Sequence, residues 1–195
     1  ELIFDRLGNT LQITLPAVLL SAALGLAWGL SCGFHKNGLA DRASTSLLIV
    51  LNALPTFLIA LVLVIVFGFK ARWLPYAGLN SATVPAGGAE YVLDRLRHLV
   101  LPVASLALAA LPSRYLMMRN MAAQAADEKY VLYARARGLP PGLIERGYIL
   151  RNIAQPFVTM AGMSVSTCVG GSLVIENVFS INGMGTLLSD AVYTL

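Results

Sequence analysis

Long runs without an ionisable side chain are the feature that most constrains how this chain can fold. Three such runs cover residues 7–34, 43–69 and 152–175, and they contain 28, 27 and 24 residues. A helix needs about 20 mostly apolar residues to cross the hydrocarbon core of a bilayer. Each run is therefore long enough to span a membrane, and a chain built from such runs is predicted to be a helical membrane protein.

The composition supports the same class. Hydrophobic residues make up 57% of the chain and charged residues only 12%, whereas soluble domains carry about 25% charged residues. This excludes a soluble globular domain, a disordered chain and a nucleic-acid-binding domain.

A fourth uncharged run, residues 99–113, has only 15 residues. It reaches spanning length if the helix continues through Arg114 to Met118, with the guanidinium reaching out to the membrane edge. We therefore predict an all-α polytopic helical bundle, a single transmembrane domain over residues 1–195. Its four spans are expected at about 11–34, 45–69, 98–118 and 153–175.

The distribution of basic residues predicts the orientation of the spans. Nine of the 14 Lys and Arg residues fall in the loops 35–44 and 114–151, which lie on the same side of a four-span chain. Cytoplasmic loops of membrane proteins carry an excess of Lys and Arg. These two loops are therefore predicted to be cytoplasmic, and the net charge of +4 reflects topology rather than a nucleic-acid partner.

The spans lack the residues that power or catalyse chemistry inside a membrane. No Asp, Glu, Lys or His lies in the middle of a predicted span, although ion-coupled carriers place ionisable groups there. This disfavours a self-contained channel or secondary carrier, which stays the alternative. The sequence Gly162-Met163-Ser164-Val165-Ser166 lacks the last glycine and the nearby base of a nucleophile motif, so no catalytic residue is expected.

Nucleotide and metal sites are not expected on this chain either. The sequence has no Gly-x-x-x-x-Gly-Lys-[Ser/Thr] loop for ATP and no cluster of His and Cys typical of a metal site. We therefore expect no cofactor and no metal ligands.

Small residues recur at every fourth position of the first predicted span. Positions four apart share one face of a helix, and small side chains on that face let a second helix approach closely. The stripe consists of Ala17, Ser21, Gly25, Gly29 and Gly33. A similar spacing in the fourth span comprises Ala154, Gly162, Ser166 and Gly170.

The loop 119–151 is too regular to be a simple connection. Residues 122–137 favour a helix that ends at Gly138, because glycine readily takes the left-handed conformation at a helix end. Pro140 and Pro141 follow, and proline suits the first turn of a second helix, which should run to about Leu150. Such a loop fits a docking element for a soluble partner or a basic segment at anionic lipid headgroups.

The residues of this loop resemble the EAA loop of binding-protein-dependent ABC importer permeases. The matching stretch is Tyr130-Val131-Leu132-Tyr133-Ala134-Arg135-Ala136-Arg137-Gly138-Leu139, followed by Leu150-Arg151-Asn152 and Pro156. Further matches are Ile175-Glu176-Asn177-Val178-Phe179, Gly183-Met184-Gly185 and Leu99-Val100-Leu101-Pro102. The branch for dipeptides, oligopeptides or nickel is the most similar. Two departures are Leu132 in place of a family Glu and Asn182 in place of a family Pro.

The resemblance implies a permease subunit in the bacterial cytoplasmic (inner) membrane, with six spans in the full protein. Such a subunit forms the path for dipeptides, oligopeptides or nickel chelates. The implied partners are a second permease, usually a paralogue, two cytoplasmic ATP-binding subunits, a periplasmic or lipid-anchored substrate-binding protein and membrane lipid.

The resemblance also implies roles for particular residues. The coupling element that docks on the ATP-binding subunits comprises Ala134, Arg135, Arg137, Gly138, Leu139, Pro140, Pro141, Ile144 and Arg146. Candidates for the lining of the translocation path are Asn52, Pro55 and Ser105. The outer segment 70–97 and residues 176–193 should face the binding protein. Trp73, Tyr76 and Tyr91 are expected in the aromatic belt at the membrane interface.

Overall fold

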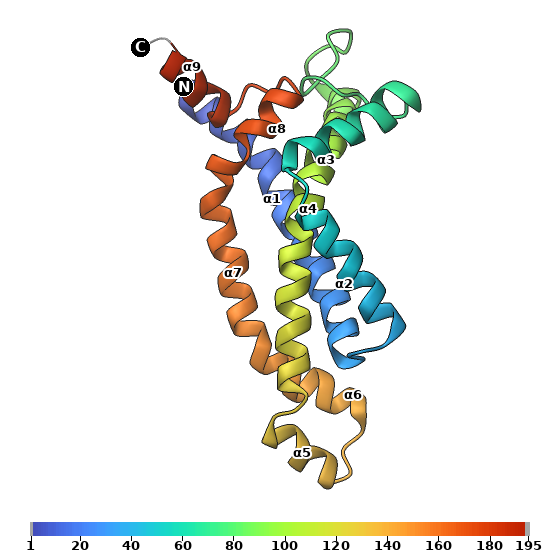
Figure 1. Cartoon of the computed structure of the whole chain (residues 1–195). Coiled ribbons are helices and arrows are strands. Elements are labelled where there is room, and N and C mark those ends of the chain that lie inside the picture. The colour runs from blue at the N-terminus through green and yellow to red at the C-terminus, as the bar shows by residue number, and fades with distance from the viewer. Residues whose placement is uncertain (1, 194–195) are drawn as a thin grey trace. The chain divides into compact units, whose positions relative to one another are not determined.

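The computed structural model describes the backbone of residues 2–193 and the side chains of residues 3–164 and 172–192. Every regular element in this part of the chain is helical (Figure 1), so the predicted all-α class is confirmed. The elements are α1 (Leu2–Phe34), α2 (Leu39–Asn52), α3 (Thr56–Leu63), the π-helical η1 (Val64–Lys70), α4 (Gly88–Ala125), α5 (Lys129–Ala136), α6 (Pro141–Leu143), the π-helical η2 (Ile144–Ile149), α7 (Leu150–Gly171), α8 (Leu173–Val178) and α9 (Met184–Tyr193).

These elements form two compact units. Unit 1 comprises residues Glu1–Leu19, Leu54–Ala109 and Val165–Leu195, and unit 2 comprises Leu20–Ala53 and Ala110–Ser164. Each of the long helices α1, α4 and α7 has one part in unit 1 and the other part in unit 2.

Two of the described helices are long and apolar enough to cross a membrane. They are Ile3–Phe34 of α1 and the whole of α4. A third would be added if Leu39–Asn52 (α2) and Thr56–Lys70 (α3 with η1), which form a bent pair, count as one span. Both long helices extend past the predicted spans 11–34 and 98–118.

The predicted span 45–69 is interrupted. Helix α2 ends at Asn52, and α3 begins at Thr56 after Pro55. Proline has no N–H to continue the hydrogen-bond ladder and disfavours a helical residue before it, which accounts for the break. The predicted span 153–175 corresponds to α7, which ends at Gly171 before α8 starts, and the side chains of 165–171 lie outside the described residues.

In unit 2, the glycines of α1 form the close contact that the small-residue stripe predicts. A Cβ atom added at Gly29 would lie 2.8 Å from the Tyr115 carbonyl oxygen of α4, and one at Gly33 would lie 2.7 Å from the Arg119 carbonyl oxygen. The two backbones are too close for any side chain at these positions, so the prediction is confirmed for this part of α1. The similar spacing in α7 has no such contact at Gly162, where a Cβ would meet nothing within 4 Å.

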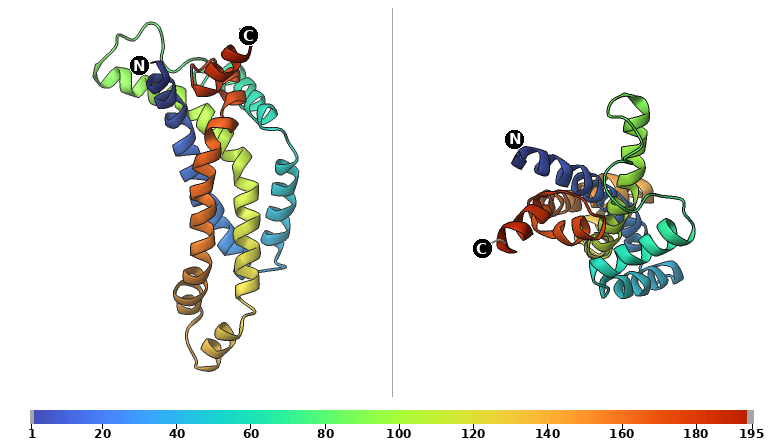
Figure 2. Two further views of the ribbon diagram at one scale, coloured as in Figure 1. Left: turned by 90° about the vertical axis from the view of Figure 1, so that its left-hand side faces the viewer. Right: turned by 90° about the horizontal axis from the view of Figure 1, so that it is seen from above.

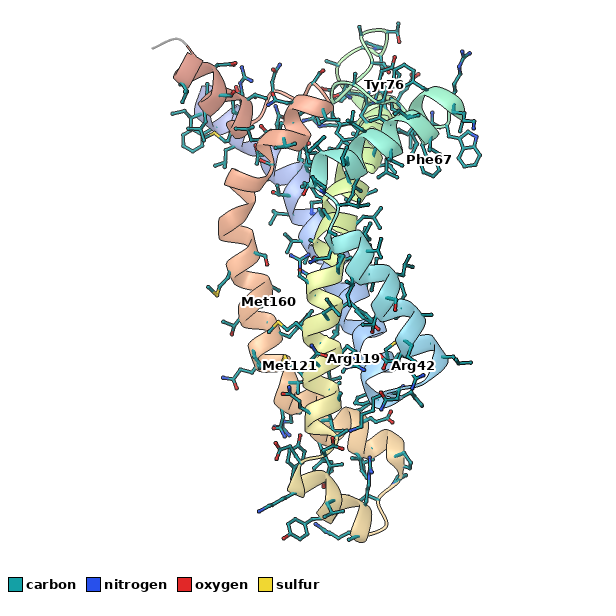
Figure 3. The ribbon with its side chains drawn as sticks, viewed as in Figure 1. Arg42, Phe67, Tyr76, Arg119, Met121 and Met160 are labelled. Atoms are coloured by element: carbon teal, nitrogen blue, oxygen red, sulfur yellow. The ribbon has the colours of Figure 1, made fainter. Side chains whose placement is uncertain are left out.

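A buried ion pair joins the start of α2 to Arg119 of α4 in the same unit; Figure 3 labels Arg119 on α4. Two guanidinium nitrogens of Arg119 donate to the two carboxylate oxygens of Asp41 at 2.9 and 2.6 Å. Asp41 also accepts the backbone N–H of Asn37 at 2.9 Å, and its side chain is only 2% exposed. The pair fixes the turn between α1 and α2 against α4.

Replacing Asp41 with asparagine should destabilise the protein. The substitution keeps the size of the side chain but leaves the Arg119 guanidinium without its carboxylate, and breaking a buried pair costs about 3 kcal/mol. The matched control is Asp127→Asn, which removes the exposed pair with Lys36 and should cost less than about 1 kcal/mol. Thermal unfolding of the purified full-length variants measures both, and equal melting temperatures for the two variants would contradict the assignment.

In unit 1, a buried carboxylate organises the segment that carries α8 and α9. Glu176 of α8 accepts hydrogen bonds from the hydroxyls of Thr10 at 2.7 Å and Ser172 at 2.8 Å, and from the backbone N–H of Thr186 at 3.0 Å. Thr10 in turn accepts the backbone N–H of Met184 at 2.8 Å. The start of α9 is thereby tied to α1.

Candidate functional site

The loop between α4 and α7 is the candidate site, and it forms one end of unit 2 (Figures 1 and 2). Helix α4 ends at Ala125, a turn covers residues 126–128, and α5 follows from Lys129 to Ala136. The single helix predicted over residues 122–137 is therefore two helices. Asp127, in this turn, forms an exposed ion pair with Lys36 of the connection between α1 and α2.

Gly138 ends α5 in the left-handed conformation, as predicted. Its φ is +74°, its N–H donates to the Arg135 carbonyl oxygen at 2.9 Å, and the Leu139 N–H donates to the Ala134 carbonyl oxygen at 3.3 Å. These bonds satisfy carbonyl groups that the end of a helix otherwise leaves open. The chain thus reverses at Gly138 within a few residues.

The second helix begins where the prolines predict, with Pro141 in its first turn. It does not end near Leu150. Helix α6, η2 and α7 follow one another without an intervening turn, so residues 141–171 are continuously helical. The loop is therefore continuous with α7, a link that was not among the predictions from the sequence.

Two of the predicted coupling residues face inward. Ala134 and Ile144 are each 3% exposed, and they pack in one hydrophobic cluster. The other buried members are Met118, Ala122, Ala125, Val131, Ile149, Ile153 and Phe157. Ala134 and Ile144 thus join α5 to the helix that follows it, and they are not available on the surface for a partner.

The remaining predicted residues lie at the surface or line a hollow. Arg135, Arg137, Gly138, Pro140, Pro141 and Arg146 are exposed, and Leu139 is half-buried. A cavity of about 300 Å³ is lined by Phe34, Ala126, Arg135, Leu139, Pro141, Ile144, Glu145 and Ile149. The loop therefore offers exposed arginines beside a hollow lined mainly by apolar residues.

Four exposed apolar side chains complete this surface, and none of them was among the predicted site residues. Leu132 and Tyr133 of α5 are 65% and 67% exposed, and Leu143 and Tyr148 are 49% and 37% exposed. We call the exposed side chains of Leu132, Tyr133, Arg135, Arg137, Leu143, Arg146 and Tyr148 the loop surface. Val131 and Ala134 fill the inner face of α5, so Leu132 and Tyr133 lie on the outer one.

The predicted path residues have different environments. Asn52 and Pro55 are exposed, and they flank the break between α2 and α3. The Ser105 side chain is fully buried, and its hydroxyl donates to the Leu101 carbonyl oxygen of the same helix at 2.8 Å. The lining of a path by these three residues stays a prediction.

A groove in unit 2 is a further candidate for contact with a solute. Its volume is about 470 Å³, and its walls are Met117 of α4 with Gln155, Pro156, Thr159, Met160 and Met163 of α7. Met160 extends from α7 towards α4 (Figure 3). Methionine side chains are flexible and polarisable and adapt to varied ligands. Among the described residues, no group of three or more His, Cys, Asp or Glu could hold a metal ion.

Comparison with known proteins identifies relatives along the whole described fold. Residues 25–195 match the family described as binding-protein-dependent transport system inner membrane component. A Brucella ovis protein named as a peptide permease is 34% identical over 195 residues, which are 99% of this chain and 59% of that protein. An oligopeptide transport system permease protein of Bacillus subtilis is 28% identical over 193 residues, 99% of this chain and 60% of its own.

A di/tripeptide transport system permease protein of Pseudomonas aeruginosa is also similar. It is 29% identical over 197 residues, which cover 94% of this chain and 59% of that protein. The chain thus spans about three fifths of the length of the curated relatives that it matches.

Proposed function

Since the chain belongs to the family of binding-protein-dependent transport system inner membrane components, we propose that the protein is a permease subunit of an ABC importer for peptides. The observation that carries this proposal is the loop between α4 and α7. Its buried side holds α5 against a helix that continues into α7, and its outer side presents the loop surface. A rigid element with an exposed apolar and basic face is suited to receive force from a soluble partner.

The partner proposed for the loop surface is a cytoplasmic ATP-binding subunit. Leu132, Tyr133 and Leu143 supply apolar contact area, and the exposed arginines supply charge that fits acidic groups. When the ATP-binding subunits close and separate, the loop moves with them, and the continuous helix 141–171 passes the motion to the membrane. Two such subunits, a second permease and a substrate-binding protein complete the proposed assembly.

Peptides are the proposed cargo. The three relatives described above carry names of peptide, oligopeptide and di/tripeptide permeases, which favours peptides over nickel chelates. The methionine groove between α4 and α7 supports the same cargo, because flexible apolar walls accept side chains of different shapes. We add this groove to Asn52, Pro55 and Ser105 as a candidate lining of the path.

Reconstitution tests the proposal against a self-contained carrier. The full-length protein is placed in liposomes alone, or together with its partner permease and ATP-binding subunits, and uptake of a labelled oligopeptide is measured with the binding protein and ATP. We expect ATP-dependent uptake only from the complete assembly, and no ATP hydrolysis by the protein alone. Peptide uptake by the protein alone would support the carrier and overturn the proposal.

A further inference from the structure

Unit 1 contains a large hollow that the proposed function does not use. It has a volume of about 800 Å³ and lies among the end of η1, the segment that follows it and the first half of α4. Tyr76 packs so closely on Gly68 that a Cβ atom there would lie 2.9 Å from the Tyr76 Cβ. The Tyr76 ring also stacks on Phe69 with centroids 4.4 Å apart. Figure 3 labels Tyr76 on the segment that follows η1.

Two guanidinium groups on the wall of this hollow lack a partner among the residues that the structure describes. Arg72 and Arg97 both line it, both are exposed, and neither has a hydrogen bond or ion pair with any residue that the structure describes. Arg95, by contrast, donates to Gln12, Asn80 and Asn9. The arginines of the hollow are thus available to a ligand, whereas their neighbour is not.

The acidic group of the hollow is already bonded. Asp94 accepts the backbone N–H and the hydroxyl of Ser81 at 2.6 and 2.9 Å. The buried His98 places its Nδ1 atom 2.8 Å from the Asp94 carbonyl oxygen and 3.6 Å from the carboxylate. Two arginines and one aspartate give the wall a charge of +1, to which His98 adds only when protonated. The hollow therefore favours an anion.

The backbone at Arg72 departs from ordinary geometry in a way that serves this arrangement. Its φ is +54°, in the left-handed region that a side chain with a Cβ rarely adopts. Such residues persist where the surrounding structure fixes them, often at ligand sites. The Trp73 N–H donates to the Phe67 carbonyl oxygen at 2.9 Å, which fixes the turn and keeps Arg72 beside the hollow.

The surroundings indicate that this anion carries an apolar tail. The strongly apolar stretch 64–69 leads directly to the hollow, and the side chains of Phe69 and Trp73 at its mouth are 56% and 74% exposed. Trp and Tyr with neighbouring Arg are typical of the membrane–water interface. A soluble anion would leave the exposed aromatic rings uncovered, whereas a lipid covers them with its glycerol and acyl regions.

We propose that this hollow binds the phosphodiester headgroup of an anionic phospholipid through Arg72 and Arg97. The aromatic rings of Phe69, Trp73 and Tyr76 then lie against the upper part of the lipid. The lipid anchors the segment between η1 and α4 at the interface. The inference depends on the membrane location of the protein and is independent of the proposed peptide transport.

Trp73 provides the reporter for a test. The full-length protein is prepared with Trp73 as the only tryptophan, through Trp28→Phe and the same replacement of any tryptophan outside these 195 residues. It is placed in phosphatidylcholine nanodiscs with a small fraction of brominated phosphatidylglycerol or of brominated phosphatidylcholine, and quenching of Trp73 fluorescence is compared. We expect stronger quenching by the anionic lipid. The one uncompensated positive charge on the wall of the hollow should enrich this lipid about fivefold beside Trp73.

Matched variants decide whether the two arginines cause this preference. Arg72→Asn with Arg97→Gln removes both charges, and asparagine tolerates the left-handed backbone, so the turn should remain intact. In this double variant, both brominated lipids should quench the Trp73 fluorescence equally. Lys70→Gln, a neighbouring cation that is not on the wall of the hollow, should keep the preference for phosphatidylglycerol.

Two outcomes overturn the proposal. One is equal quenching of the Trp73-only protein by both lipids, and the other is an unchanged preference in a double variant that elutes as a folded protein. If the Trp73-only protein shows no lipid preference and the double variant binds the substrate-binding protein more weakly, the hollow receives an acidic protein segment instead of a lipid.

Discussion

Replacing Gly138 with tryptophan should reduce ATP-dependent peptide uptake to the background level while the protein still inserts into the membrane. Gly138 has a φ of +74°, and a residue with a Cβ loses about 1–2 kcal/mol in this conformation. A Cβ at Gly138 would meet nothing within 4 Å, so the damage comes from the backbone and from the bulk presented to a partner. Because Gly138 joins α5 to α6, a changed turn displaces the whole loop surface. Uptake by cells and the amount of protein in the membrane fraction measure the two effects.

Three further variants separate backbone geometry from bulk. Gly138→Val has little bulk but is poorly tolerated in the left-handed region, and it should also lose most uptake. Gly138→Asn should retain a large part of the peptide uptake, because asparagine adopts the left-handed conformation readily. Gly142→Ala is the matched control, since Gly142 lies in α6 with open space around it and no positive φ, and its uptake should be unchanged.

The coupling assignment would be wrong if Gly138→Trp and Gly138→Val both inserted and transported normally. If Gly138→Asn were as inactive as Gly138→Val, the left-handed turn would not be the reason for the loss. These outcomes concern coupling alone, and they leave the lipid site near Arg72 untouched.

The turns of this protein follow from local chemistry, which is why the sequence predicts them. Gly138 and Pro141 each restrict their own backbone in a known way, and the structure places the turn and the helix start at these residues. Pro55 carries the same kind of signal. The stretch predicted as a span over 45–69 contains two helices that meet at this proline.

Contacts between distant residues could not be predicted in the same way. Nothing in the pattern around Asp41 identifies Arg119 as its partner, 78 positions later. The carboxylate of Glu176 is likewise bonded to Thr10, 166 positions earlier. Such pairs depend on how the helices pack, and one sequence contains no record of that packing.

In the candidate site, too, the local features could be predicted from the sequence and the features that depend on packing could not. Hydropathy and the resemblance locate the loop and its exposed arginines, but they do not distinguish inner from outer positions on short helices. Ala134 and Ile144 were predicted as coupling residues and lie in the core of the unit, whereas Leu132 and Tyr133 are exposed. Which side of each short helix is buried depends on the cluster that α5 forms with η2 and α7.

The packing of α1 on α4 leads to the second large effect. Replacing Gly29 with leucine should destabilise the protein by about 3 kcal/mol or more, because overpacking against a fixed backbone ranks among the costliest substitutions. The first atom of the new side chain would already lie 2.8 Å from the Tyr115 carbonyl oxygen and 2.9 Å from the Met118 Cβ. Neither α1 nor α4 can yield there without separating along the neighbouring contacts of Gly25 and Gly33. The variant should therefore show a much lower melting temperature or fail to accumulate in the membrane.

Gly8→Ala is the control in the same helix. A Cβ at Gly8 meets nothing within 4 Å, and alanine favours a helix over glycine by up to about 1 kcal/mol, so this variant should be as stable as the natural protein or slightly more stable. Gly29→Ala adds only the single Cβ and should fall between the two. If Gly29→Leu melted at the same temperature as Gly8→Ala, the close approach of α1 to α4 would be wrong. A graded loss from Gly8→Ala through Gly29→Ala to Gly29→Leu, with Gly162→Ala in α7 unaffected, would instead identify α1 as the helix whose small residues determine the packing of unit 2.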